Sequence, residues 1–413
     1  MIARHCFDEV IRIRQHRPLI DVAHLFARHR GERQNHPAFH RVEHDVAVAV
    51  VDQRGTLCQV PAWIKFLNTH PCDIRAMSSW HIRFLIRQCA MSFVVAVTDY
   101  VFPSLEPEQR VLEPLGVELR AQQCRSEDEI IALVQDADAV LNYYAKMTAR
   151  VIEKLGRCKI IARYGIGVDN VDLVAATRAG IVVTNVPDYC IDEVSDHALA
   201  LLLALARRIV PADGAVKAGG WEVVAHAGIR RLRGQTLGLA GFGKIAVAVA
   251  TKAQSFGLRV LACDPYLGSE AMSRHGAQAV DFDRLLAESD AISIHVPLSP
   301  ETRNLIGARE LARMKSTAFL INTSRGGIVD EQALAAALKE GRLGGAAFDV
   351  LGVEPPPPEH PLCKLPNVIL TPHLAFYSRE SVIELQTKAA EEVARALKGE
   401  PPRSPVNPEV LTG

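Results

Sequence analysis

The chain has 413 residues, 48% of them hydrophobic, which is enough for two domains with sizeable cores. Its 47 basic and 47 acidic residues give a formal net charge of +0, which argues against general binding to nucleic acid or to an anionic membrane. The nine cysteines never occur as C-x-x-C, a usage typical of a reducing cytoplasm rather than of a disulfide scaffold. The longest apolar run, 198–206, is too short to span a bilayer, and we expect a cytoplasmic protein.

Residues 1–90 differ in composition from the rest of the chain. They hold nine of the fifteen histidines and little helical or strand periodicity. These histidines and cysteines could be metal ligands, but the ligand spacings of zinc modules are missing, so we predict no metal site. We expect the stretch to be a disordered extension or the result of a miscalled start, with translation beginning at Met91.

From Met91 onward, apolar strands alternate with helical segments, which predicts parallel sheets covered on both faces. A first, flavodoxin-like unit is expected, and the helix 192–207 then leads to a second α/β unit. The strands expected in the first unit are 93–98, 117–119, 139–142, 159–162 and 181–184, with helices at 126–134 and 171–179; those of the second are 236–240, 259–263, 291–295, 319–322, 346–349 and 368–370.

The end of the chain is predicted to form one amphipathic helix that packs back on the first unit. Ser381 and Glu384 have the spacing of a capping box, and the proline-rich residues 401–413 suggest an extended tail. The expected domains are therefore 91–192 together with 376–405 for the substrate, and 193–375 for the nucleotide.

The stretch 236–246 is typical of a strand that runs into a glycine turn and opens a helix. Gly241 permits the tight turn, Gly243 lets the backbone approach a pyrophosphate, and Ala246 allows close packing of helix on strand. The helix N-terminus attracts the anion. A second strand ends at Asp264, whose carboxylate can accept ribose hydroxyls and repels a 2′-phosphate, so the sequence favours NAD over NADP.

Three further segments place polar residues where strands should end, the edge at which open parallel sheets bind ligands. They contribute Arg325, the carboxylates Asp349 and Glu354, and His373. A cation that holds a substrate carboxylate and a histidine that donates a proton suit reduction of a 2-keto acid. A buried Glu354 beside His373 would favour the imidazolium, and Asp349 would face the nicotinamide.

Together these motifs resemble the D-isomer-specific 2-hydroxyacid dehydrogenase superfamily over residues 91–407. The resemblance rests on 241–246, 264–266, the segment 295–302, the segment 322–330, 349–355 and 371–373. It implies that Arg325, Glu354 and His373 are catalytic, that the substrate domain comes from both ends of the chain, and that a dimer forms through the NAD-binding domain. The implied cofactor-binding residues are Gly241, Gly243, Lys244, Ile245, Asp264, Pro297, Thr302, Thr323, Ser324, Arg325, Asp349 and His373.

Within the family's pattern, residues 163–170 resemble the loop whose backbone N–H groups receive the substrate carboxylate. Gly167 and Val168 are the candidates, with Arg325 as the third substrate contact. The implied activity is an NAD-dependent interconversion of a 2-keto acid and a D-2-hydroxy acid, with no membrane or direct nucleic-acid partner.

The segments 186–190 and 371–378 look most similar to the branch that contains C-terminal-binding proteins and their bacterial dehydrogenase relatives. Two alternatives stay open. One is an NAD(H)-sensing regulatory protein of that branch, and the other is a 3-phosphoglycerate dehydrogenase, although Asn142 stands where those enzymes generally place an arginine that suits a phosphate.

Overall fold

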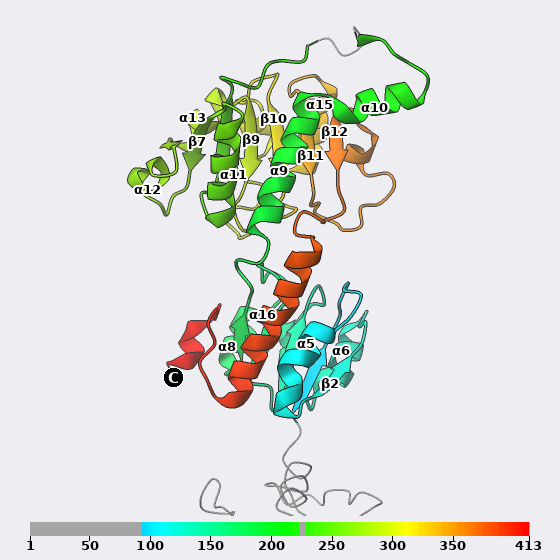
Figure 1. Ribbon diagram of the computed structural model, residues 1–413, viewed down its shortest axis with the longest axis vertical. Coiled ribbons are helices and arrows are strands. Elements are labelled where there is room, and N and C mark those ends of the chain that lie inside the picture. The colour runs from blue at the N-terminus through cyan, green and yellow to red at the C-terminus, as the bar shows by residue number, and fades with distance from the viewer. Residues whose placement is uncertain (1–92, 224–227, 413) are drawn as a thin grey trace, which may run out of the picture. The chain divides into compact units, whose positions relative to one another are not determined.

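The computed structural model describes residues 93–223 and 228–412, which belong to one compact unit. This part of the chain contains two β-sheets in which every paired strand is parallel, as predicted (Figure 1). The extension predicted for residues 1–90 lies outside the described residues.

The first sheet has five strands in the order β2-β1-β3-β4-β5, which is the flavodoxin-like order. Its central strands are continuous apolar runs because helices cover both faces. Ser126 caps α6 and Asp172 caps α8 by accepting backbone N–H groups, so these two helices begin where polar residues meet an apolar stripe. The elements are β1 (Val94–Val97), α5 (Glu106–Leu112), η2 (Glu113–Leu115), β2 (Glu118–Ala121), α6 (Glu127–Val134), β3 (Ala139–Asn142), α7 (Ala149–Ile152), β4 (Ile160–Arg163), α8 (Leu173–Arg178) and β5 (Val182–Thr184).

The second sheet has seven strands in the order β12-β11-β10-β9-β6-β7-β8. Counted from β6, this is the dinucleotide-binding order 3-2-1-4-5-6 with one more edge strand. Sequence analysis missed the edge strand β8, because Ala-Gln-Ala carries no β-branched or aromatic residue. The elements are α9 (Ile191–Ala206), α10 (Ile209–Lys217), β6 (Thr236–Ala240), α11 (Lys244–Ser255), β7 (Arg259–Cys263), α12 (Ser269–Ser273), β8 (Ala277–Ala279), α13 (Phe282–Glu288), β9 (Ala291–Ile294), α14 (Ala308–Leu311), β10 (Phe319–Asn322), α15 (Glu331–Lys339), β11 (Gly345–Phe348), η4 (Pro361–Lys364) and β12 (Val368–Leu370).

The last helix, α16 (Arg379–Lys398), packs on α5, β3 and β4 of the first sheet. Its apolar stripe is buried at Val382, Leu385, Ala389, Val393 and Leu397. The predicted capping box was wrong: Ser378 is the N-cap and exchanges hydrogen bonds with Ser381, because the helix begins three residues earlier than the Ser381–Glu384 spacing suggested.

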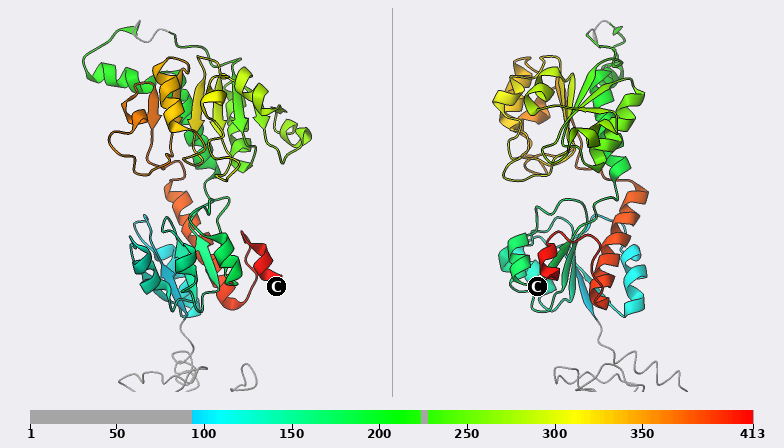
Figure 2. Two further views of the ribbon diagram at one scale, coloured as in Figure 1. Left: turned by 180° about the vertical axis from the view of Figure 1, so that it is seen from behind. Right: turned by 90° about the vertical axis from the view of Figure 1, so that its left-hand side faces the viewer.

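The tail was also predicted wrongly. It turns back beside β5, where Val406 N–H donates to Val183 O and the buried Asn407 side chain bonds Val183 N and Ile181 O (Figure 2). It ends in the short helix η5 (Pro408–Leu411). The prolines leave few N–H groups to satisfy, and an asparagine supplies the missing bonds to the sheet edge.

The glycine turn lies at the point where the strand order of the second sheet reverses, between β6 and β9. Gly241 has φ 88, and a Cβ there would stand 2.7 Å from the carbonyl oxygen of His295. Gly243 differs: its φ is −76, it is the N-cap of α11, and nothing lies within 4 Å of the place where a Cβ would be. Gly241 is therefore required by the fold, whereas Gly243 leaves open space in front of a helix N-terminus.

This difference gives a matched pair of variants. We expect Gly243→Ala to fold with a melting temperature within about 2 °C of the parent, since its φ suits alanine and no atom is displaced. Its methyl group would occupy the space open to a pyrophosphate and weaken NADH binding about tenfold, measured by fluorescence titration. Gly241→Ala should instead lower the melting temperature. Unchanged NADH affinity in Gly243→Ala would contradict a phosphate site at this turn.

Candidate active site

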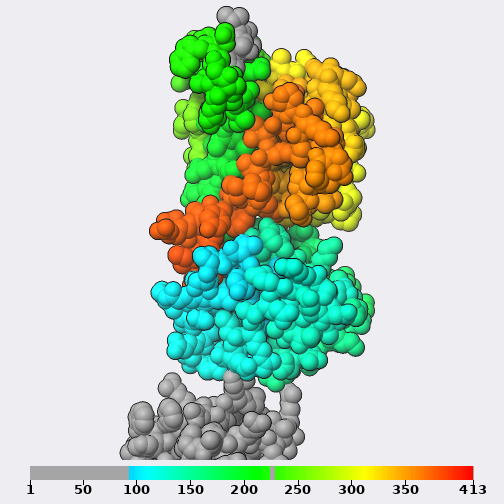
Figure 3. Space-filling view, turned by 90° about the vertical axis from the view of Figure 1, so that its right-hand side faces the viewer, coloured from blue at the N-terminus to red at the C-terminus, as the bar shows by residue number. Residues whose placement is uncertain are grey.

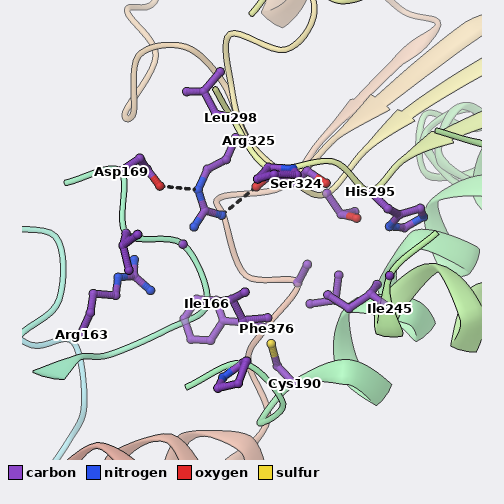
Figure 4. A pocket seen from close by; sticks show the side chains of 18 of the residues that line it. Arg163, Ile166, Asp169, Cys190, Ile245, His295, Leu298, Ser324, Arg325 and Phe376 are labelled. Atoms are coloured by element: carbon purple, nitrogen blue, oxygen red, sulfur yellow. Dashed lines mark hydrogen bonds and ion pairs between the residues drawn. The ribbon is translucent and has the colours of Figure 1, made fainter. Parts of the chain in front are cut away.

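A cavity of about 690 Å³ opens at the carboxyl ends of strands from both sheets. The first sheet contributes the loops that follow β3 and β4, with Tyr144 and Gly167 on its wall. The second contributes the loops after β6, β9, β10 and β11, including Lys244 and Arg325 (Figure 4). Polar loop ends from two sheets thus face one space. Strand ends predicted the contribution of the second sheet, and the family resemblance predicted that of the 163–170 loop.

Arg325 stands directly over the loop that follows β4. Its Nε donates to Asp169 Oδ1 at 3.0 Å and its Nη1 to Ser324 O at 2.8 Å (Figure 4). A Cβ on Gly167 would collide with the guanidinium Nη2, so only glycine lets the arginine approach this loop. The guanidinium also lowers the pKa of Asp169: burial alone would raise it, but the charge of Arg325 and its hydrogen bond outweigh burial.

His373 and Glu354 form a hydrogen-bonded pair, with Nδ1 2.7 Å from Glu354 Oε2. Glu354 is held in turn by the N–H of Leu351, which donates to its Oε1 at 2.9 Å. The expectation that Glu354 is buried was wrong, because its side chain is 34% exposed on a loop. Partial burial raises the pKa of Glu354, but the hydrogen bond and charge of His373 lower it further, so the carboxylate stays ionised.

The carboxylate of Asp349 fixes the loop that carries His373. Oδ1 accepts the hydroxyl of Thr371 and the N–H of Leu374, while Oδ2 accepts the N–H of Ala375. His197 on α9 lies 3.0 Å from the same threonine hydroxyl. These bonds hold His373 at φ 51, a left-handed conformation that histidine adopts only when its surroundings impose it.

Sequence analysis did not single out Arg163, at the end of β4. Its side chain lines the cavity, is only 8% exposed and forms no ion pair with a carboxylate in the part of the chain that is described. Its Nε is buried without a hydrogen-bond partner, and the guanidinium lies 5.8 Å from the centre of the Tyr143 ring. Burial, and secondarily the charge of Arg325, lowers its pKa. The sequence pattern that could have indicated Arg163 is a charged residue directly after three apolar residues of a strand.

Aromatic rings surround His373 on the side of the first sheet. The Tyr144 ring meets the imidazole edge-on with centroids 5.8 Å apart, and the Phe376 ring does so at 6.3 Å. Burial raises the pKa of Tyr144, which therefore keeps its proton at neutral pH. The wall next to His373 is thus apolar and uncharged.

The predicted cofactor residues lie on the wall formed by the second sheet, with three exceptions. Gly243, Lys244, Ile245, Pro297, Thr323, Ser324, Arg325, Asp349 and His373 line the cavity. Gly241, Asp264 and Thr302 do not line it. Asp264 accepts N–H groups of Phe242 and Tyr266, and Thr302 donates to Pro297 O at 2.6 Å, so these residues shape the neighbouring turns.

Two observations fit a nicotinamide dinucleotide on this wall. The helix N-terminus at Gly243 faces open space, and Thr323 Oγ1 is buried with no hydrogen-bond partner. His295 closes the end of β9: burial lowers its pKa to about 4, so the ring beside Ser293 is neutral at physiological pH. Within 93–223 and 228–412, no cluster of side chains suits a metal ion, and no helix is long and apolar enough to cross a membrane.

Comparison with known proteins supplies the family. Residues 199–375 match the family described as D-isomer specific 2-hydroxyacid dehydrogenase, NAD binding domain. A glyoxylate reductase of Korarchaeum cryptofilum is 43% identical over 290 residues, which cover 69% of this chain and 87% of the relative. The structure of D-lactate dehydrogenase from Aquifex aeolicus, complexed with NAD and lactic acid, superposes with a TM-score of 0.68 at 28% identity and covers 77% of this chain and 98% of that one.

A D-3-phosphoglycerate dehydrogenase of Archaeoglobus fulgidus is 43% identical over 293 residues, which cover 71% of this chain and 55% of the relative. The chain therefore spans about half the length of the curated D-3-phosphoglycerate dehydrogenases it matches, which are covered to 55%, 52% and 59%. The predicted assignment to the C-terminal-binding-protein branch stays a prediction. The chain belongs to the D-isomer-specific 2-hydroxyacid dehydrogenase family and contains its NAD-binding domain.

Proposed function

We propose that the protein is an NAD-dependent oxidoreductase that interconverts a 2-keto acid and a D-2-hydroxy acid. The observation that carries the proposal is the hydrogen bond between His373 Nδ1 and Glu354, in a cavity that also contains Arg325 and the helix N-terminus at Gly243. Relatives named glyoxylate reductase, and the lactate dehydrogenase bound to NAD and lactic acid, support the same reaction class.

His373 is the proton donor of this reaction. Its Nδ1 bonds the ionised Glu354, which orients the ring and leaves Nε2 to deliver the proton. NADH, which the cavity wall at Gly243 and Thr323 would hold, would supply the hydride for the carbonyl carbon of the 2-keto acid. As the C=O double bond becomes a single bond, the oxygen takes the proton from His373 Nε2, and oxidation of the hydroxy acid follows the reverse course.

The substrate carboxylate is received by the backbone N–H groups of Gly167 and Val168 and by the guanidinium of Arg325. Arg325 already reaches over Gly167, so the three donors converge on one part of the cavity. Asp169 holds Arg325 in this position through the bond to Nε and leaves Nη2 toward the loop. The ground state and the developing alkoxide both gain from a fixed cation.

The remaining assignments follow the same proposal. The cofactor contacts are the nine predicted residues that line the cavity, and Asp264, beside the glycine turn, selects NAD over NADP. Residues 91–192 with 376–405 form the substrate domain and 193–375 the NAD-binding domain. A cytoplasmic location is supported by the five cysteines of the described residues, all of which are free.

Two variants test the catalytic roles. We expect His373→Asn, which tolerates the left-handed backbone at this position, to lower kcat by a factor of about 10³ while NADH affinity changes less than about twofold. Arg325→Ala should raise KM and lower kcat together. Both are measured with glyoxylate, hydroxypyruvate, phenylpyruvate and 2-ketoisocaproate, each with NADH and NADPH.

Full activity of His373→Asn would remove this residue from the proton-donor role. A parent protein that binds NADH but reduces none of the four keto acids, with 3-phosphoglycerate oxidation also absent, would contradict the enzyme assignment. That outcome would favour the NAD(H)-sensing alternative.

A second candidate substrate carries a second anionic group, as in 3-phosphoglycerate. The specific observation in its favour is Arg163, a buried guanidinium without a carboxylate partner in the described structure, which lines the same cavity as Arg325 (Figure 4). The sequence argued against this substrate because Asn142 stands where 3-phosphoglycerate dehydrogenases generally place an arginine. That argument is weaker now, because Arg163 can supply the cation for the phosphate. Relatives named D-3-phosphoglycerate dehydrogenase agree with this candidate.

Arg163→Met separates the two substrate classes. If Arg163 receives a second anion, kcat/KM for 3-phosphoglycerate falls about 100-fold, the loss expected for one charged hydrogen-bonding partner, while kcat/KM for phenylpyruvate stays within about threefold. A parent enzyme with no activity on 3-phosphoglycerate, or an Arg163→Met variant that keeps it, would exclude this candidate.

The protein is proposed to form a homodimer through the NAD-binding domain. None of the residues of α10 is buried, and Ile209, Val210 and Val216 are about half exposed, at 53%, 52% and 48%. Trp221, which follows the helix, is 82% exposed. In Figure 3 the green segment that includes α10 stands at the surface. Apolar side chains of this size are commonly covered by a partner.

Trp221→Glu tests this surface. We expect the parent to sediment as a dimer. In the variant the dissociation constant of the dimer should rise at least about tenfold, because a buried carboxylate would face the apolar surface of the partner. Ile383→Glu is the control, since Ile383 is 51% exposed on α16. A monomeric parent, or equal dissociation of both variants, would contradict the proposal.

A further inference from the structure

A part-buried hydrogen-bonded pair, Glu331 and His360, lies outside the cavity, next to the turn that carries Glu354. Glu331 is the first residue of α15, and its Oε2 lies 3.0 Å from Nε2 of His360. Their side chains are only 15% and 10% exposed. Nδ1 of His360 is buried without a hydrogen-bond partner. Because one ring nitrogen of His360 has no hydrogen-bond partner, the pair contributes little to the stability of the fold. We therefore infer a different role for it from the other contacts of Glu331.

The other carboxylate oxygen of Glu331 points to the loop that holds Glu354. Oε1 accepts the N–H of Gly352 at 2.7 Å. The neighbouring N–H, that of Leu351, donates to Glu354 Oε1, and Glu354 Oε2 bonds His373. Two sets of hydrogen bonds, joined by the backbone between Leu351 and Gly352, thus connect α15 to the imidazole of His373.

The same turn touches the loop of Arg325. A Cβ on Gly326 would collide with the carbonyl carbon and oxygen of Leu351, so the two backbones are in direct contact. The 351–354 turn therefore packs against the loop that carries Arg325, and its Glu354 bonds His373. The Glu331 carboxylate holds the turn itself through the N–H of Gly352. Because the turn is exposed at Gly352 and Val353, packing alone holds it weakly.

We propose that Glu331 and His360 are positioning residues that act through the 351–354 turn to keep Glu354 aligned with Nδ1 of His373. His360 orients the Glu331 carboxylate, the carboxylate fixes the Gly352 N–H, and the fixed turn determines where Glu354 meets the imidazole. The inference rests on the proposed function, in which His373 delivers the proton.

The charged and titratable groups that face the Glu354–His373 pair are Arg325 and Tyr144. Neither forms a hydrogen bond with Glu331 or His360 among the described residues. A change in the pH profile on altering Glu331 therefore has to pass through the turn. This separates a positioning role from a purely structural one.

The test compares Glu331→Ala, Glu354→Gln and the double variant. We expect Glu331→Ala to lower kcat about tenfold with KM changed less than about twofold, and to move the basic limb of the kcat/KM profile to lower pH, in the direction of Glu354→Gln. The double variant should be no slower than Glu354→Gln within about twofold, because both changes act on one unit. Glu331→Gln, which keeps an oxygen for Gly352, should stay within about threefold of the parent.

Glu340→Ala is the matched control, since Glu340 stands at the other end of α15 and pairs with the exposed Arg342. Melting temperature and NADH affinity of each variant separate misfolding from misalignment. If Glu331→Ala does not fold, His360→Ala takes its place, with a loss in kcat of about threefold and the same shift of the profile.

The outcomes of this experiment distinguish an error in the proposed function from an error in the positioning role. An inactive parent or an unaffected Glu354→Gln would refute the proposed function itself. A normal defect in Glu354→Gln together with an unshifted profile in Glu331→Ala and His360→Ala, or fully additive losses in the double variant, would overturn the positioning role alone.

Discussion

The loop that carries His373 depends on the acceptance of backbone N–H groups by the carboxylate of Asp349. His373 has a left-handed backbone at φ 51, which a loop does not keep without restraint. Asp349 supplies the restraint, since it is 2% exposed and accepts the N–H groups of the two residues after the histidine. A carboxylate can accept several hydrogen bonds at once, so one side chain converts a flexible strand end into a rigid support for an imidazole.

The same device recurs at the strand ends around the cavity. Asp99, after β1, accepts the N–H groups of residues 143–145, which set the position of Tyr144. Asp264, after β7, accepts the N–H of Phe242 inside the glycine turn. Loops at the carboxyl ends of parallel strands leave N–H groups without strand partners, and acidic side chains satisfy them without closing the cavity. The charge of these acids is therefore directed at backbone dipoles.

Much of the fold could be predicted because its signals are local. Six of the second sheet's seven strands, including 236–240 and 319–322, follow from apolar runs between turns. The misses have physical causes. The tail gains its structure from Asn407, whose amide bonds to a strand more than two hundred residues earlier, and β8 is a three-residue edge strand. Hydrophobic periodicity reveals neither the tail structure nor β8, because each forms through hydrogen bonds to a strand elsewhere in the sequence.

The candidate site shows where residue types predict chemistry and where they do not. Arg325 and His373 were predicted because three strand ends together offer a cation, a carboxylate and an imidazole, although each residue alone has common structural uses. Asp349 and Glu354 illustrate the difficulty: both are loop acids that follow β11, yet one is buried among N–H groups and the other is a third exposed beside the imidazole. Arg163 was overlooked for the opposite reason, since its strand is wholly apolar and a terminal arginine is normally solvated. Only the fold shows that its guanidinium has no carboxylate partner among the described residues, which leaves the cation free to influence the choice of substrate.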